Sequence, residues 1–70
     1  MTELEESSLD ISEFEAIRLI DFKRIPQNEA AKKMKISQPT FSRILNIGRE
    51  KIADAIVNGK AIRIENKNEK

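Results

Sequence analysis

The stretch 27-QNEAAKKMKISQPTFSRI-44 decides the fold of this 70-residue chain. Its first half has apolar residues at the i, i+1, i+4 spacing of one buried helical side: Ala30, Ala31 and Met34. This spacing predicts a short helix over residues 27–34. Ser37 follows after only two residues, and its hydroxyl can cap a second helix, in whose first turn Pro39 is tolerated. Two helices joined so closely predict a helix-turn-helix.

The second helix is expected to run from Gln38 to about Asn58, where Gly59 provides a C-terminal stop. A continuous apolar stripe follows its 3.6-residue period: Phe41, Ile44, Leu45, Gly48, Ile52, Ala55 and Ile56. Glycine in a helix costs up to about 1 kcal/mol relative to alanine. Gly48 is therefore expected to allow close approach of another helix, or a bend.

The packing needs of a helix-turn-helix are met here with one exception. Ala31 is small where the second helix must cross, and apolar residues are available to fix both helices and the turn: Ala30, Met34, Ile36, Phe41 and Ile44. The turn usually has glycine before its apolar residue, because the backbone takes a positive φ there. Lys35 occupies that place, at an expected cost of about 1 kcal/mol.

A further helix is expected before this pair. Ser12 and Glu15 have the spacing of a capping box, so this helix should begin after Ser12 and continue to about residue 22 or 23. Pro26 prevents its extension. The residues expected on its buried face are Phe14, Ile17 and Ile20, with Leu19 at the margin.

Short alternating segments flank the helices. Residues 9–11 (LDI) give a weak strand signal, and residues 60–65 (KAIRIE) predict a strand. A lone strand is unstable, so the second could pair with residues 8–11 of the same chain or with a second subunit. The predicted fold is mainly α, a three-helix helix-turn-helix core with a short C-terminal strand. We expect a domain over residues 9–65, an acidic, partly disordered segment 1–8, and a disordered tail 66–70.

The composition excludes several classes of function. The chain contains no cysteine, histidine, tryptophan or tyrosine, which removes disulfides and most common metal ligands, general bases and nucleophiles. We therefore expect no enzyme activity, no metal and no cofactor. No segment has the length and apolarity of a signal peptide or membrane helix, so a cytoplasmic protein without membrane association is expected. No small-molecule effector is identifiable.

The net charge of +1 conceals an asymmetry. Residues 1–15 contain six acidic side chains and no basic one, a sum of −6. Residues 22–53 contain eight basic and two acidic side chains, a sum of +6. The positive segment includes the helix-turn-helix, which favours a polyanionic partner. A solvated helix surface is the alternative interpretation.

The outward residues of the second helix indicate the partner. Glutamine, arginine and asparagine can form paired hydrogen bonds with adenine or guanine edges in the major groove. The predicted base-contacting residues are Gln38, Pro39, Ser42, Arg43 and Asn46. The predicted backbone-contacting residues are Gln27, Asn28, Lys33, Lys35, Thr40 and Arg49. A helical hairpin whose polar residues are merely solvated remains the alternative for each of them.

Together these features predict sequence-specific binding of double-stranded DNA and a role in transcription regulation. RNA is less favoured, because no aromatic residue outside the core is available to stack on bases. A homodimer is expected, with residues 47–57 and the strand after Gly59 as the candidate dimer surface. The alternative is a protein-interaction module that docks on a transcription-related partner.

The segments SEFEAIRLID, EAAKKMKISQPTFSRIL and REKIADAIVNGKAIRIE resemble a family of small, poorly characterised prokaryotic proteins described as DNA-binding. The resemblance covers about residues 4–65. The family's helix-turn-helix is similar to region four of bacterial sigma factors. The resemblance implies a three-helix DNA-binding core whose recognition positions are Gln38, Pro39, Thr40, Ser42 and Arg43.

This sequence departs from the family pattern in two respects. Lys35 replaces the family's turn glycine. Relatives often carry a basic, sometimes cysteine-containing N-terminal segment, and some carry an appended cofactor-related domain. Neither is present in this sequence, so sensing functions associated with those parts are not carried over.

Overall fold

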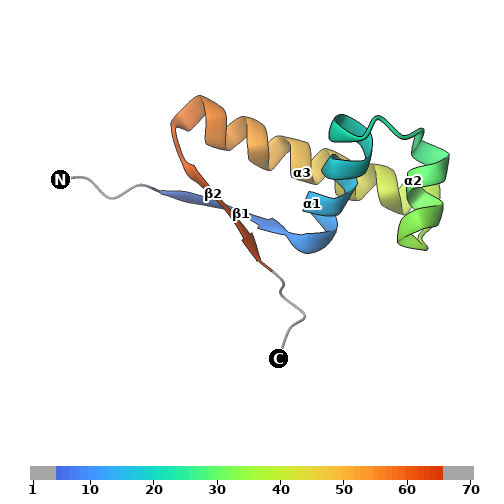
Figure 1. Ribbon diagram of the computed structural model, residues 1–70. Helices are drawn as coiled ribbons and strands as arrows, with labels where there is room; N and C mark the ends of the chain where they lie inside the picture. Colours follow the sequence, from blue (N-terminus) through green and yellow to red (C-terminus); the bar gives the residue numbers. More distant parts are fainter. Residues whose placement is uncertain (1–4, 66–70) are drawn as a thin grey trace.

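A computed structural model describes residues 5–65, which form one long helix with shorter elements packed against it (Figure 1). In chain order the elements are β1 (Glu6–Asp10), α1 (Ile11–Ile17), η1 (Arg18–Phe22), α2 (Gln27–Met34), α3 (Gln38–Asn58) and β2 (Ala61–Glu65). The predicted fold class is confirmed: the described residues are mainly helical, with three helices and a short strand pair. No helix within them is both long and apolar enough to cross a membrane.

The first strand begins earlier than the sequence predicts. β1 begins at Glu6, so residues 6–8 form a strand rather than belonging to a partly disordered segment. Residues 1–4 and the predicted disordered tail 66–70 lie outside the described residues.

The predicted bounds of α2 and α3 are confirmed. α3 begins where Ser37 adopts an extended conformation and its Oγ accepts the Thr40 amide at 3.4 Å. It ends where Gly59 takes a left-handed φ of 64° and donates its amide to the carbonyl of Ala55. At 21 residues, α3 is about 31 Å long at roughly 1.5 Å per residue. It is the longest helix of the domain, and α1, α2 and β1 all contact it.

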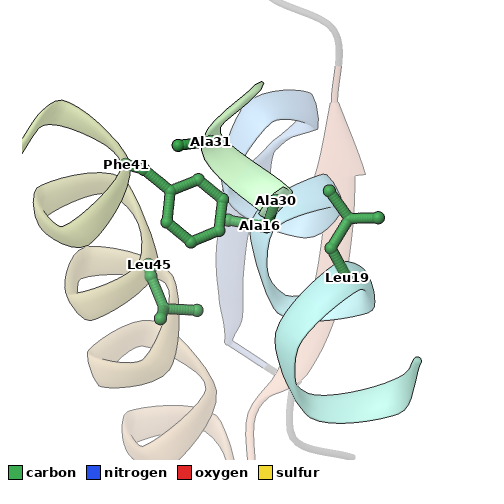
Figure 2. Packing of buried hydrophobic residues seen from close by; sticks show 6 residues of the cluster. All are labelled: Ala16, Leu19, Ala30, Ala31, Phe41 and Leu45. Atoms are coloured by element: carbon green, nitrogen blue, oxygen red, sulfur yellow. The ribbon is translucent and has the colours of Figure 1, made fainter. Parts of the chain in front are cut away.

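The core lies where α1, η1 and α2 meet the first turns of α3. The Phe41 ring projects from α3 toward Ala16 and Ala30, and Leu19 and Leu45 lie beside it (Figure 2). Phe41, Ala16 and Ala30 have no exposed surface. Partly buried side chains complete the packing: Ile17, Ile20, Ile25, Met34, Ile36 and Ile44. The residues predicted to fix the helix-turn-helix are therefore all in or against the core.

The predicted start of the first helix was wrong by two residues. α1 begins at Ile11, and the capping box is formed by Asp10 and Glu13, with the Asp10 amide donating to Glu13 Oε1 at 3.0 Å. Ile11, predicted to end a strand, is the first helical residue. Ser12 is the second helical residue and therefore not the predicted cap. The Glu15 carboxylate instead binds Arg18 through two hydrogen bonds, at 2.7 and 3.0 Å.

The predicted buried face of this helix is confirmed in part: Ile17 and Ile20 are partly buried against the core. Ala16 and Leu19 are buried, whereas Phe14 is 37% exposed. Small Ala16 lies in the same buried cluster as Phe41 of α3, and Ile17 and Ile20 pack against that cluster. The helix also widens into the π-helical η1, where the Lys23 amide donates to the Arg18 carbonyl at 2.9 Å. Apolar spacing alone does not reveal such a widened turn.

Gly48 marks the closest approach of α1 to α3. A Cβ atom at this position would lie 2.8 Å from Ile17 Cδ1 and 3.2 Å from Glu13 Cβ. Across the same contact, Lys51 Nζ binds Glu13 Oε1 at 2.8 Å. The predicted use of Gly48 for close helix approach is therefore confirmed.

β1 and β2 form a two-stranded parallel sheet. The register runs from Glu6 opposite Ala61 to Asp10 opposite Glu65. Of the two pairings left open by the sequence, the one within the chain is present. Leu9 is buried on the helix side of this sheet, and the Ser7 hydroxyl donates to the Lys51 carbonyl at 3.1 Å. These contacts hold β1 against α3.

Replacing Gly48 with valine should destabilise the domain. The new methyl groups would overlap Ile17 and Glu13, and overpacking of this kind costs about 1–3 kcal/mol. The gain in helix propensity recovers only a few tenths of a kcal/mol. Urea unfolding should show a lower midpoint for Gly48→Val. Ala53→Val, at an exposed position of the same helix, should change stability by less than about 0.7 kcal/mol. Equal stability of the two variants would contradict the close contact.

Candidate nucleic-acid interface

The turn between α2 and α3 reverses the chain within two residues. Lys35 has φ 61° and ψ 42°, so the predicted left-handed residue is present. Its amide donates to the Lys32 carbonyl at 3.0 Å, and the Ile36 amide donates to the Ala31 carbonyl at 3.1 Å. This pair of hydrogen bonds is a Schellman motif, which satisfies the last carbonyls of a helix. It leads the chain directly from α2 into the Ser37 cap of α3.

Four of the five predicted base-contacting residues are exposed on the first turns of α3: Gln38, Pro39, Arg43 and Asn46. Ser42, between them, is partly exposed. Gln38, Arg43 and Asn46 form no hydrogen bond or ion pair with another described side chain. Because Phe41 and Leu45 are buried on the other side of the helix, these polar groups lie at the surface without a partner among residues 5–65.

The six predicted backbone-contacting residues are also exposed: Gln27, Asn28, Lys33, Lys35, Thr40 and Arg49. Gln27 and Asn28 form the first turn of α2, next to Pro26. Lys33 is on its last turn, and Lys35 is in the turn that follows. The Thr40 hydroxyl accepts a hydrogen bond from Ser37 at 3.0 Å, within the cap of α3.

Residues 27–46 carry four basic and one acidic side chain, a local charge of +3. All five are exposed: Glu29, Lys32, Lys33, Lys35 and Arg43. The most negative part of the described chain, β1 with the start of α1, lies against the distal half of α3 instead (Figure 1). Lys51 binds Glu13 of this acidic part, whereas the basic side chains of residues 27–46 form no ion pair with it among the described residues.

Arg49 has a partner that the sequence did not reveal. Its guanidinium binds the Asp21 carboxylate through two hydrogen bonds, Nη2–Oδ1 at 2.7 Å and Nε–Oδ2 at 3.1 Å. The hydrogen bond from Arg49 lowers the pKa of Asp21 and raises the pKa of Arg49. Both side chains remain almost half exposed, at 48% and 44%. The pair links η1 to α3, and no local pattern connects two residues 28 positions apart.

Arg24 is a second feature without a sequence signal. It is exposed and has a positive φ of 60°, in the connection between η1 and α2. A shallow depression beside it is lined by Ile20, Asp21, Arg24, Ile25 and Pro26.

Among residues 5–65, no group of three acidic, histidine or cysteine side chains is placed to hold a metal ion.

Comparison with known proteins places this sequence in a family. The profile described as "Protein of unknown function DUF134" matches residues 1–70. The chain belongs to the DUF134 family. A UPF0251 protein of Thermoanaerobacter pseudethanolicus is 54% identical over 68 residues, which cover 97% of this chain and 58% of that protein. A UPF0251 protein of Caldanaerobacter subterraneus is 57% identical over 67 residues, which cover 96% and 57%.

A third DUF134 relative, the UPF0251 protein of Moorella thermoacetica, is 55% identical over 65 residues, 93% of this chain and 44% of that protein. The chain thus spans about half the length of the curated relatives that it matches. No solved structure matches it. The resemblance to a small, uncharacterised prokaryotic family is confirmed.

Replacing Lys35 with glycine should stabilise the domain by about 0.5–1 kcal/mol. A left-handed conformation costs a non-glycine residue about 1–2 kcal/mol, and the extra backbone entropy of glycine offsets about 0.5–1 kcal/mol of that gain. Lys35→Ala removes the same charge but keeps the strained φ, so its stability should stay near that of the wild type. Thermal unfolding of both variants distinguishes the effect of the backbone strain at residue 35 from the effect of the lost charge. A glycine variant no more stable than the alanine variant would contradict the strain.

Proposed function

We propose that this chain binds double-stranded DNA sequence-specifically through α2 and α3 and regulates transcription. The observation that carries the proposal is the exposure of Gln38, Arg43 and Asn46, which have no partner in the described part of the chain and follow a turn fixed by core packing. These are the side-chain types that form paired hydrogen bonds with base edges. Because core packing fixes the helix that carries these side chains, binding does not have to order that backbone.

In this proposal the first turns of α3 enter the major groove, and α2 crosses the phosphate backbone, as in other helix-turn-helix proteins. Arg43 contacts a guanine edge, and Gln38 or Asn46 contacts adenine. The N-terminus of α2, with Gln27 and Asn28, faces a phosphate, where free backbone amides favour an anion. Lys33 and Lys35 add phosphate contacts that position the protein without reading sequence.

Arg49 also contacts a phosphate in this proposal, after leaving Asp21. An exposed ion pair contributes only about 0–1 kcal/mol. Releasing Arg49 from Asp21 therefore costs little once DNA supplies a phosphate within reach. In the unbound protein, Asp21 holds the Arg49 guanidinium in a fixed position on the side of α3 that follows Asn46.

The binding unit is a homodimer. Two copies would place α3 in successive major grooves, about 34 Å apart along the duplex. A single domain with few base-reading side chains binds specific sites weakly, and a second copy adds contacts at a related half-site. The proposed activity is binding rather than catalysis.

A protein-interaction module is the second candidate. Phe22 is 79% exposed at the end of η1, so the expectation that no aromatic residue lies outside the core was wrong. Aromatic side chains are enriched in protein interfaces. Retention on heparin or bulk duplex DNA at low salt separates the two candidates. A chain that fails to bind either, but recovers a protein partner, would favour the second.

Arg43→Ala should weaken binding to a duplex that the wild type recognises by about 5- to 150-fold, since a base-reading arginine contributes about 1–3 kcal/mol. Titrations at two salt concentrations should show that wild-type binding weakens as salt rises. Arg18→Ala is the matched control, because Arg18 is a partly exposed arginine that binds Glu15 on the first helical segment. Its affinity should stay within about twofold of the wild type. Absence of salt-dependent binding to any duplex, or equal losses in both variants, would contradict the proposal.

A further inference from the structure

The outer edge of β2 is unpaired within the described residues. β2 has β1 on one side only. The Ala61 amide donates to the Glu5 carbonyl at 2.9 Å, on the β1 side. Because backbone groups alternate in direction along a strand, the amides and carbonyls of Ile62 and Ile64 point to the open edge. An open edge strand is a template for pairing with another strand.

The side chains at this edge are apolar on one face. Ile62 and Ile64 are in register with Ser7 and Leu9, so all four lie on the face of the sheet that packs on the helices. Ser7 and Leu9 are buried there, but Ile62 and Ile64 remain 45% and 46% exposed. The apolar face of the sheet therefore extends beyond the helices that cover β1.

Within one chain, Arg63 forms exposed ion pairs with Glu65 at 3.2 Å and with Glu6 at 3.4 Å. Exposed pairs of this kind contribute only about 0–1 kcal/mol, and the charges of β2 are also complementary to those of a second β2. In an antiparallel pair with Ile64 on the two-fold axis, Arg63 of each copy lies opposite Glu65 of the other. Moving the axis to Arg63 would place two guanidinium groups opposite each other. Moving it to Ile62 would place Arg63 opposite Ala61. Opposite charges across a strand pair are favourable and like charges unfavourable, so charge selects the axis at Ile64.

The charges along β1 are not complementary to those of a second β1. An antiparallel pair of two β1 strands centred on Ser8 would place Glu6 of one copy opposite Asp10 of the other. This arrangement brings four carboxylates together in two like-charged pairs, without a base on the strand. Of the two strand edges, only that of β2 is complementary to its own copy.

We propose that two copies of this chain associate through antiparallel pairing of their β2 strands, with Ile64 on the two-fold axis. The result is a four-stranded sheet in the order β1–β2–β2–β1. Each copy then covers the exposed Ile64 of the other. This inference rests on the homodimer of the proposed function and names its surface. Exposed Ile56 and Val57, on the last turn of α3, add apolar surface immediately before β2.

The base-reading end of α3 stays free in this dimer. Gln38 and Asn46 lie in the first turns of the helix, whereas β2 follows its C-terminal end (Figure 1). The dimer contact and the proposed DNA contact therefore use different residues. Each can be measured without the other.

Two charge reversals test the pairing by sedimentation analysis in the absence of DNA. Arg63→Glu and Glu65→Arg each place like charges opposite each other in their own homodimer. Each alone should raise the dimer Kd about tenfold or more. In an equimolar mixture, every reversed side chain meets the opposite charge on the other variant, so heterodimers should form with a Kd close to that of the wild type. Lys32→Glu is the control, because it makes the same charge change at an exposed position of α2.

Circular dichroism identifies any variant that fails to fold, and the recovery in the mixture cannot come from two unfolded chains. A wild type that stays monomeric at the highest attainable concentration would overturn the proposal. Reversals that leave the Kd unchanged, or a mixture that associates no better than its components, would do the same. A dimer that does not bind DNA would overturn the proposed function and leave this inference standing. A monomer that binds DNA sequence-specifically would overturn this inference and the homodimer of the proposed function, and would leave the proposed DNA recognition by α3 standing.

Discussion

The packing of one phenylalanine between alanines determines the arrangement of the helices. Phe41 and its neighbours Ala16 and Ala30 are completely buried, so α1 and α2 approach α3 as closely as a single ring permits. Removing such a ring costs about 3–5 kcal/mol. A domain of 70 residues is typically stable by only about 4–10 kcal/mol. The angle between α2 and α3, and hence the residues of α3 that face outward, depends largely on this contact.

The same constraint explains why Lys35 tolerates a left-handed backbone. Ile36 must reach the core and Ser37 must cap α3 immediately after α2 ends, so the chain has to reverse at Lys35. The cost of about 1–2 kcal/mol is small beside the core contacts that it permits. A lysine here keeps a positive charge at the tip of the turn, next to the exposed polar residues of α3. If that charge contacts phosphate, the strain is offset by binding rather than by stability.

The helix-turn-helix could be predicted from sequence because its signals are local: a proline stop, a serine cap, a glycine stop and one apolar period. The bounds of α2 and α3 follow from these signals. The start and the complete buried face of α1 could not be predicted from sequence. Two capping boxes compete for the start, and the ion pair of Glu13 with Lys51 joins residues that are remote in sequence. The π-helical turn then shifts the buried face. The exposed site residues followed from the buried stripe, whereas the Arg49–Asp21 pair required the tertiary structure.

Selection of binding sites from random duplex DNA tests DNA recognition most directly. We expect the wild-type chain to enrich a defined sequence. Because the proposed dimer is symmetric, that sequence should contain two inverted half-sites separated by about one helical turn. Recovery of a pool indistinguishable from the starting DNA, at a salt concentration low enough for non-specific binding, would contradict sequence-specific recognition by α3.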